Sequence, residues 1–270
     1  MSPAFSTRSV SSHIELDVTE EAELVWSVAV ARGPELASES LVITVDGNPV
    51  EVKELEVDDG GRLHVCTAAP GRLALAYSAE VSGRAAPATV DPVDDIVYRR
   101  PSRYAESDEI GPTAWPEFSK LEGKALLDAV SSWVGTQLYY VSGSSRPTDG
   151  ATQTLLLRKG VCRDFAHVVI ALLRARNVPA RLVAVYAPGL SPMDFHAVVE
   201  AAIDGRWRAV DATTLAPRGP LVRIATGRDA SDTAFLTVQS GRTTLVSMDV
   251  TATAEPGLPA DDLTSLVSLT

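Results

Sequence analysis

The sequence predicts an α+β protein in which a small all-β region is followed by a core with one strong helix packed on an antiparallel sheet. Short segments with β-type alternation, separated by turn residues, fill residues 1–85. After a proline-rich stretch, the apolar residues change to a helical spacing. A hairpin signal, Asp204-Gly205, then joins two further strand candidates downstream of the strongest helix. Together these three observations define the fold class.

The composition is that of a folded protein. Of the 270 residues, 45% are hydrophobic and 22% are charged, which suits one large domain or two modest ones. The formal net charge of −11 argues against nucleic-acid and membrane partners, and it does not predict an oligomeric state. Residues 1–10 are polar without a secretory apolar segment, and the most apolar stretch, residues 165–173, is too short to span a membrane. We therefore expect a cytoplasmic protein.

The two cysteines, Cys66 and Cys162, fit a reducing compartment better than a disulfide framework. The four histidines do not pair with them at the spacing of a zinc site. We expect no metal and no organic cofactor.

Residues 1–85 are predicted to form a small antiparallel sandwich or barrel, because short strand candidates recur at close spacing. The candidates are residues 14–18, 24–30, 41–45, 50–55, 63–67 and 73–81. Residues 86–118 contain five prolines and little periodicity, and we expect an ordered connector there.

Residues 119–252 are predicted to form the core, and residues 253–270 a loose tail or a short helix. The spacing of apolar residues and the positions of helix-breaking residues predict the elements of the core. The expected helices are 121–138, 152–157 and 162–176; the expected strands are 181–187, 196–203 and 207–210, followed by a closing hairpin of 235–238 and 243–250 over Ser240-Gly241.

Cys162 lies at the predicted start of the strongest helix, directly after Gly160-Val161. The N-terminus of a helix carries partial positive charge and unpaired N–H groups. Both favour the thiolate, and the N–H groups can stabilise an oxyanion when the thiolate attacks a carbonyl. Gly160 allows a sharp turn into the helix and close approach of a substrate. The alternative is a small buried cysteine, which is how we interpret Cys66.

A thiolate nucleophile needs a base, and the base needs an orienting acceptor. His196 opens a predicted strand, and Asp211 ends its partner in the same hairpin. The two side chains are therefore expected to be neighbours across the strand pair. Taken singly, each has an ordinary structural interpretation. Taken together with Cys162, they predict a Cys-His-Asp triad.

These residues also fall in motifs that resemble the bacterial transglutaminase-like superfamily. The motifs are Gly160-Val161-Cys162, Asn177-Val178-Pro179-Ala180-Arg181, His196-Ala197, and Trp207 to Asp211-Ala212-Thr213. The resemblance implies a papain-like α+β core with Cys162 as nucleophile, His196 as base and Asp211 as orienting acid. It further implies a transglutaminase-like cysteine protease or amidase that acts on a peptide or protein amide through a thioester. Hydrolysis is expected in preference to cross-linking.

The sequence departs from the family pattern at two positions. Val198 stands where a tryptophan is usual, and Asn177 where a glycine is usual. Val198 leaves open a second interpretation, a catalytically inactive binding or scaffold module with the same fold.

Several other residues are weaker candidates for the cleft. Gln153, Tyr140 and Val198 are possible oxyanion or cleft residues. Asp164 is interpreted as a partner of the helix dipole, and His167 as a histidine on the helix flank. Gly227-Arg228-Asp229 is a turn that could border the site.

Overall fold

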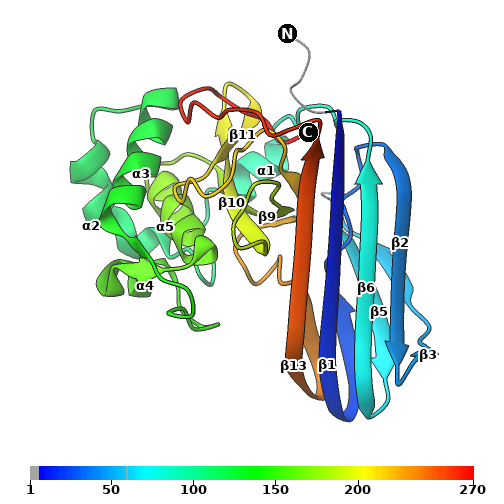
Figure 1. Cartoon of the computed structure of the whole chain (residues 1–270). Coiled ribbons are helices and arrows are strands. Elements are labelled where there is room, and N and C mark those ends of the chain that lie inside the picture. The colour runs from blue at the N-terminus through cyan, green and yellow to red at the C-terminus, as the bar shows by residue number, and fades with distance from the viewer. Residues whose placement is uncertain (1–5, 59) are drawn as a thin grey trace.

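The computed structural model describes residues 6–58 and 60–270, so the first five residues of the predicted 1–85 domain, and Asp59 within it, lie outside the description. A large antiparallel sheet stands beside a second, smaller sheet that is covered by helices (Figure 1). The α+β class predicted from the sequence is therefore confirmed. None of the helices in the described ranges is long and apolar enough to cross a bilayer.

The large sheet is organised around one long strand, β1 (Thr7–Trp26). Most of its first half alternates between buried and more accessible side chains, with Val10, Ile14 and Leu16 facing a hydrophobic core. The other strands are β2 (Leu36–Val45), β3 (Asn48–Pro49), β4 (Lys53–Glu56), β5 (Arg62–Ala68), β6 (Gly71–Val81) and β13 (Leu236–Glu255). They form one seven-stranded sheet in the order β3-β2-β6-β1-β5-β4, with β13 paired to β1.

The buried face of the large sheet packs against the second half of the chain. Tyr186, Val222 and Ile224, from the smaller sheet and its edge, belong to the same hydrophobic cluster as the inward residues of β1 and β6. The Tyr186 hydroxyl donates to the carbonyl oxygen of Val28 at 2.8 Å. The two sheets therefore share one core, and the N-terminal strands are part of the structure that surrounds the smaller sheet.

The predicted closing hairpin at residues 235–250 is wrong. Residues 236–255 form a single strand that pairs with β1 from Trp26 opposite Leu236 to Thr7 opposite Glu255. Gly241 lies where the register of this pair shifts, and a Cβ there would lie 2.1 Å from the carbonyl oxygen of Glu21. The glycine thus marks a close backbone approach at an irregularity of the pair, which in the sequence resembles a turn. The division of the chain into residues 1–85, 86–118, 119–252 and 253–270 stays a prediction. The strand β13 begins within the predicted core but pairs with β1 of the N-terminal region.

The segment predicted as a connector contains two helices, α1 (Pro92–Val97) and α2 (Ser107–Phe118). In α2 the buried residues Ile110, Ala114 and Phe118 recur every four positions. Pro112 and Pro116 lie between them, and they obscured this helical pattern in the sequence.

The second half of the chain follows the predicted order of elements closely. It contains α3 (Gly123–Gln137), α4 (Ala151–Leu157), α5 (Cys162–Ala175), β9 (Ala180–Tyr186), β10 (Phe195–Ile203), β11 (Arg206–Val210) and β12 (Val222–Gly227). The four strands form an antiparallel sheet in the order β11-β10-β9-β12. The strand β12 was not predicted. Two short strands, β7 (Tyr139–Tyr140) and β8 (Lys159–Gly160), pair in parallel just before α5.

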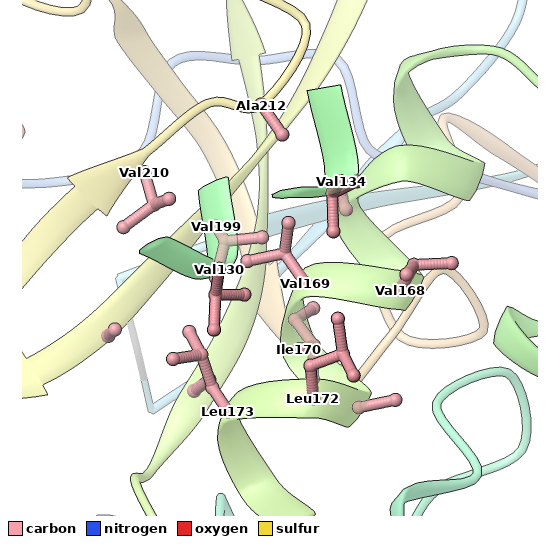
Figure 2. Packing of buried hydrophobic residues seen from close by; sticks show 14 of the residues in the cluster. Val130, Val134, Val168, Val169, Ile170, Leu172, Leu173, Val199, Val210 and Ala212 are labelled. Atoms are coloured by element: carbon pink, nitrogen blue, oxygen red, sulfur yellow. The ribbon is translucent and has the colours of Figure 1, made fainter. Parts of the chain in front are cut away.

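Helix α5 is the centre of the second half. Every residue from Asp164 to Arg174 is buried, so the helix is enclosed on all sides and not on one face as the sequence pattern indicated. Figure 2 shows its side chains packed against α3, β10 and β11. The residues labelled there include Val130 and Val134 of α3, Val168, Val169, Ile170, Leu172 and Leu173 of α5, Val199 of β10 and Val210 of β11.

A buried ion cluster fixes the strands of the small sheet. Glu200 of β10 is 1% exposed and accepts hydrogen bonds from Arg181 of β9 at 2.8 Å and from Arg223 of β12 at 2.7 Å. The Arg181 guanidinium also lies over the ring of Trp207, 4.0 Å from its centroid. The Pro-Ala-Arg and tryptophan motifs singled out in the sequence therefore meet in the interior and tie β9, β10, β11 and β12 together.

The C-terminal segment after β13 is neither loose nor helical. It is irregular, and Asp261 forms a 2.8 Å ion pair with Arg218. The backbone N–H of Ala209 donates to the carbonyl oxygen of Val267 at 2.8 Å, and Leu269 is 4% exposed. The segment is a strap bound along β11.

The packing of α5 predicts which leucine matters for stability. Leu172 has no exposed surface, so Leu172→Ala leaves a cavity in the centre of the core and should lower the free energy of unfolding by about 2–5 kcal/mol. Leu156→Ala is the matched control, because Leu156 is 74% exposed on α4 and should change stability by less than about 0.5 kcal/mol. Urea unfolding followed by circular dichroism measures both, and equal losses would contradict the central role of α5.

Candidate active site

Cys162 is the first residue of α5 and is partly accessible, as the sequence predicted. The helix begins at this point because Asp164 caps it: the backbone N–H of Val161 donates to Asp164 Oδ2 at 2.8 Å. Asp164 is 1% exposed, and its other oxygen, Oδ1, accepts from the hydroxyl of Ser145 at 2.9 Å. The acid interpreted as a partner of the helix dipole is thus a buried cap that fixes the chain before Cys162.

Gly160 provides the space for this cap. A Cβ at Gly160 would lie 2.6 Å from the Cβ of Asp164 and 2.7 Å from its Oδ2. Gly160 is buried, so its missing side chain makes room for Asp164 rather than for a substrate. The expectation that Gly160 allows close approach of a substrate is therefore wrong.

The structure brings His196 and Asp211 together across the hairpin, as expected. His196 is the second residue of β10, Asp211 directly follows β11, and Nε2 of the ring lies 2.8 Å from Oδ2 of the carboxylate. The other carboxylate oxygen, Oδ1, accepts from the backbone N–H of Thr213 at 2.9 Å and from its hydroxyl at 2.7 Å. Both oxygens of Asp211 are therefore occupied, which fixes the orientation of the carboxylate.

Cys162 lies beside His196, and the two side chains line the same cavity. Since Nε2 faces Asp211, Nδ1 is the ring nitrogen left for the sulfur. Burial lowers the pKa of His196, but the hydrogen bonds to Asp211 and Cys162 and the negative charges of both outweigh burial and raise this pKa to about 10. The ring is 2% exposed, so the raised pKa favours a buried imidazolium beside the Asp211 carboxylate.

Tyr140 reaches the start of α5 through the short strand pair β7–β8. It lies opposite Gly160 in that pair, and its hydroxyl is near the backbone N–H of Cys162. Burial raises the pKa of Tyr140, and the nearby charge of Cys162 raises it further. Tyr140, proposed from the sequence as an oxyanion or cleft residue, is thus beside the sulfur.

Gln153 and Val198 lie elsewhere. Gln153 is exposed on α4, and Val198 is 1% exposed in a hydrophobic cluster with Val183 and Val185. Neither residue is among those that line the cavity at Cys162.

His167 is a buried residue, and the prediction of a flank histidine is wrong. Its Nε2 accepts from the backbone N–H of Ala230 at 3.2 Å, and its ring stacks on Tyr104 with centroids 5.5 Å apart. Burial lowers the pKa of His167 to about 3, against the opposing charge of Asp229. Asp229 in turn accepts from the backbone N–H of Tyr104 at 2.8 Å. The neutral ring therefore fastens the turn at residues 227–230 to α5.

A cavity of about 300 Å³ lies beside Cys162 and His196. Its walls come from the start of α5, from β9, β10 and β12, and from the turn that ends at Phe235. The large sheet contributes as well, through Ser27, Leu236 and Met248. The sequence did not predict a role for the large sheet at the site. Its three cavity residues are separated from Cys162 by long stretches of chain and belong to no motif.

The chain matches the family model of the transglutaminase-like superfamily over residues 119–212. A crystal structure of a candidate cysteine protease from Cytophaga hutchinsonii is similar over 98% of this chain and 96% of its own, with a TM-score of 0.88 and 33% sequence identity. This chain therefore belongs to the transglutaminase-like superfamily.

Curated relatives are similar over shorter stretches. The Mycobacterium leprae protein ML0607 is 27% identical over 134 residues, which is 45% of this chain and 47% of that protein. The Mycobacterium tuberculosis protein Rv2569c is 41% identical over 61 residues, or 23% of this chain and 19% of that protein. The matched part of the chain thus spans about half the length of the first relative and about a fifth of the second.

Gly160→Ala tests the cap before the nucleophile. The added methyl group must displace the buried Asp164 side chain, so we expect a loss of about 1–3 kcal/mol in the free energy of unfolding and slower alkylation of Cys162. Gly257→Ala is the control, because a Cβ at Gly257 has no neighbour within 4 Å. Identical stability and alkylation rates in the two variants would show that Asp164 does not need this space.

The charge of the His196 ring should depend on Asp211. In the wild type, NMR titration is expected to show His196 still protonated well above pH 7. The stabilisation that goes with this raised pKa is complete below the ordinary pKa of about 6.5 and is lost as the pH rises through about 10. Asp211→Asn removes the main counter-charge, burial then dominates, and the pKa of His196 should fall.

Two controls accompany this titration. The His196→Gln variant assigns the resonance, and Asp108→Asn removes an exposed carboxylate at the start of α2. The pKa of His196 should be the same in Asp108→Asn as in the wild type. An equal change in Asp108→Asn and Asp211→Asn would rule out a specific pair.

Proposed function

We propose that the protein is a thiol-dependent amidase or protease in which Cys162, His196 and Asp211 form a catalytic triad. The observation that carries the proposal is the 2.8 Å pair of the His196 ring and the Asp211 carboxylate, with Cys162 and His196 lining the same cavity. A nucleophile, a base and an orienting acid in this order are what acyl transfer requires. Membership of the transglutaminase-like superfamily and the similarity to a candidate cysteine protease support the same class of activity.

In the proposed acylation step, the Cys162 thiolate attacks the carbonyl carbon of an amide, and a carbon–sulfur bond forms as the carbonyl oxygen becomes an oxyanion. When the oxyanion collapses, the carbon–nitrogen bond breaks, and the His196 imidazolium gives its proton to the departing amine. Asp211 holds the ring in the orientation that serves both steps. The product is a thioester on Cys162.

In the deacylation step, the neutral His196 ring takes a proton from water as the water oxygen attacks the thioester carbon. The carbon–sulfur bond breaks, a carboxylic acid leaves, and the thiolate and imidazolium are restored. An amine could replace water and give transfer. We propose hydrolysis as the main outcome, as expected for a bacterial family member.

The oxyanion is proposed to form at the N-terminus of α5. The backbone N–H of Cys162, the first residue of the helix, is near the Tyr140 hydroxyl. A substrate oxygen there could accept from the N–H and from the phenol O–H, and such donors stabilise developing charge. Tyr140 is therefore proposed as an oxyanion donor in preference to Gln153, which is exposed on α4.

Val198 is buried and is not among the residues that line the cavity, which supports the catalytic proposal over an inactive scaffold. The cytoplasm remains the proposed location. Two free cysteines, one of them the proposed nucleophile, are suited to a reducing compartment.

Cys162→Ala should reduce the hydrolysis of fluorogenic peptide amides by at least about a thousandfold without changing the unfolding midpoint, because the nucleophile is lost and little packing is altered. Cys66→Ala is the matched control and should keep wild-type activity. Unchanged hydrolysis by the Cys162→Ala protein would overturn the proposal.

Iodoacetamide labelling at pH 6 provides a readout that needs no substrate. Cys162 should react first, because Cys66 is 3% exposed and burial raises the pKa of its thiol. Mass spectrometry locates the label, and equal, slow labelling of both cysteines would speak for the scaffold alternative.

A further inference from the structure

The cavity beside Cys162 has the composition of a side-chain pocket. Most of the side chains that line it are apolar, among them Leu182, Phe195, Ile224, Phe235, Leu236 and Met248. Its volume of about 300 Å³ is at the lower end of the ~300–1,000 Å³ typical of ligand pockets. A pocket of this size and composition suits one apolar side chain of a substrate, and it is too small for a peptide segment.

The walls of the cavity are held in place by contacts across the two sheets. Phe195 of β10 stacks on Phe235 with ring centroids 5.6 Å apart and packs against Tyr186 in a tilted arrangement with centroids 5.5 Å apart. The backbone N–H of Ser27, which follows β1, donates to the carbonyl oxygen of Phe235 at 3.0 Å. The aromatic wall is therefore anchored to the large sheet on one side and to the small sheet on the other, and the pocket is preformed.

Besides His196 of the proposed triad, Arg163 and Asp194 are charged residues that border the cavity, and both are already engaged within the chain. The Arg163 guanidinium donates to the hydroxyl of Ser145 and, at 2.8 Å, to the carbonyl oxygen of Arg146. The Asp194 carboxylate accepts from the backbone N–H of Phe195 at 2.7 Å. The two charges are opposite in sign and neither dominates the lining, so the apolar surface sets the preference.

The position of the sulfur identifies which part of a substrate the cavity would hold. Cys162 and His196 both line it, and on the proposed mechanism the acyl part stays bonded to Cys162 while the amine departs. The cavity next to the sulfur is thus next to the acyl part of the thioester.

We propose that this cavity is the acyl-side specificity pocket, that it selects substrates with a bulky apolar or aromatic residue on the acyl side of the cleaved bond, and that the large sheet forms one of its walls. The inference rests on the proposed function. It gives the N-terminal strands and β13 a direct role at the site, because Ser27, Leu236 and Met248 face the same cavity as the nucleophile.

The test uses the full-length protein and peptide amides that share one coumarin leaving group and differ only in the acyl-side residue, which is Phe, Leu, Ala, Arg or Asp. We expect kcat/KM for Phe and Leu to exceed that for Ala by about 10- to 100-fold, since each buried methylene contributes to discrimination. Equal values across the series would overturn the proposal. A preference for Arg would also overturn it, and would indicate recognition by Asp194 instead.

Variants on β13 connect the preference to the large sheet. Met248→Trp narrows the cavity and should lower the ratio of kcat/KM for Phe to that for Ala at least about tenfold. Leu236→Ala is a second variant that enlarges the cavity, and it should shift the optimum toward larger residues. Val246→Trp is the control, because Val246 is 44% exposed on the same strand and does not line the cavity. A ratio unchanged in both pocket variants would overturn the role of the sheet.

Affinity labelling separates this inference from the proposed function. Peptidyl chloromethyl ketones react once, when a thiolate displaces chloride and forms a thioether, so labelling of Cys162 needs no hydrolysis. Faster labelling by the Phe reagent than by the Ala reagent, with no turnover of any amide, would keep the pocket and reject the hydrolase. Hydrolysis of the amides without a preference for Phe over Ala in either assay would support the proposed hydrolase and overturn the proposed specificity pocket.

Discussion

The burial of α5 on every side is the constraint on which the rest of the structure depends. A helix enclosed by other helices and by the strands of the small sheet cannot rotate or slide without opening the core, so the position of its first residue is fixed to the precision of packing. Asp164 and Gly160 complete this restraint at the N-terminus, where packing alone would leave a fraying end. Cys162 is thus presented from a rigid element, which is the arrangement that a reactive group requires.

The side of the site that carries His196 is held by buried ion pairs. Glu200 and its two arginines join three strands through buried charges, and the removal of one partner would leave an uncompensated charge in the interior. Thr213 then occupies the free oxygen of Asp211. His196 therefore meets Cys162 where a packed helix and an ion-paired sheet converge, and neither part has to move to bring the two side chains together.

Local patterns in the sequence predicted this part of the molecule well. Helical spacing located α3, α4 and α5, and the Asp204-Gly205 turn placed His196 and Asp211 in one hairpin. What they could not reveal were contacts between distant segments: the pairing of β13 with β1, and the wall that Leu236 and Met248 form at the cavity. Side-chain alternation shows that a strand has a buried face but not which strand lies beside it. The cap by Asp164 was missed for a similar reason, since its role depends on a space that only the folded chain defines.

The pairing of β1 with β13 has a consequence for biosynthesis. A ribosome releases residues in order, and the strand that begins at Thr7 must wait for the strand that ends at Glu255 before its edge is covered. Such pairing across most of the chain is slow to form and leaves an exposed edge until it does. The segment with Cys162 and His196 emerges earlier, while the residues of β13 that border its cavity are still unsynthesised. A nascent chain would therefore hold Cys162 and His196 before it holds the wall of the cavity beside them.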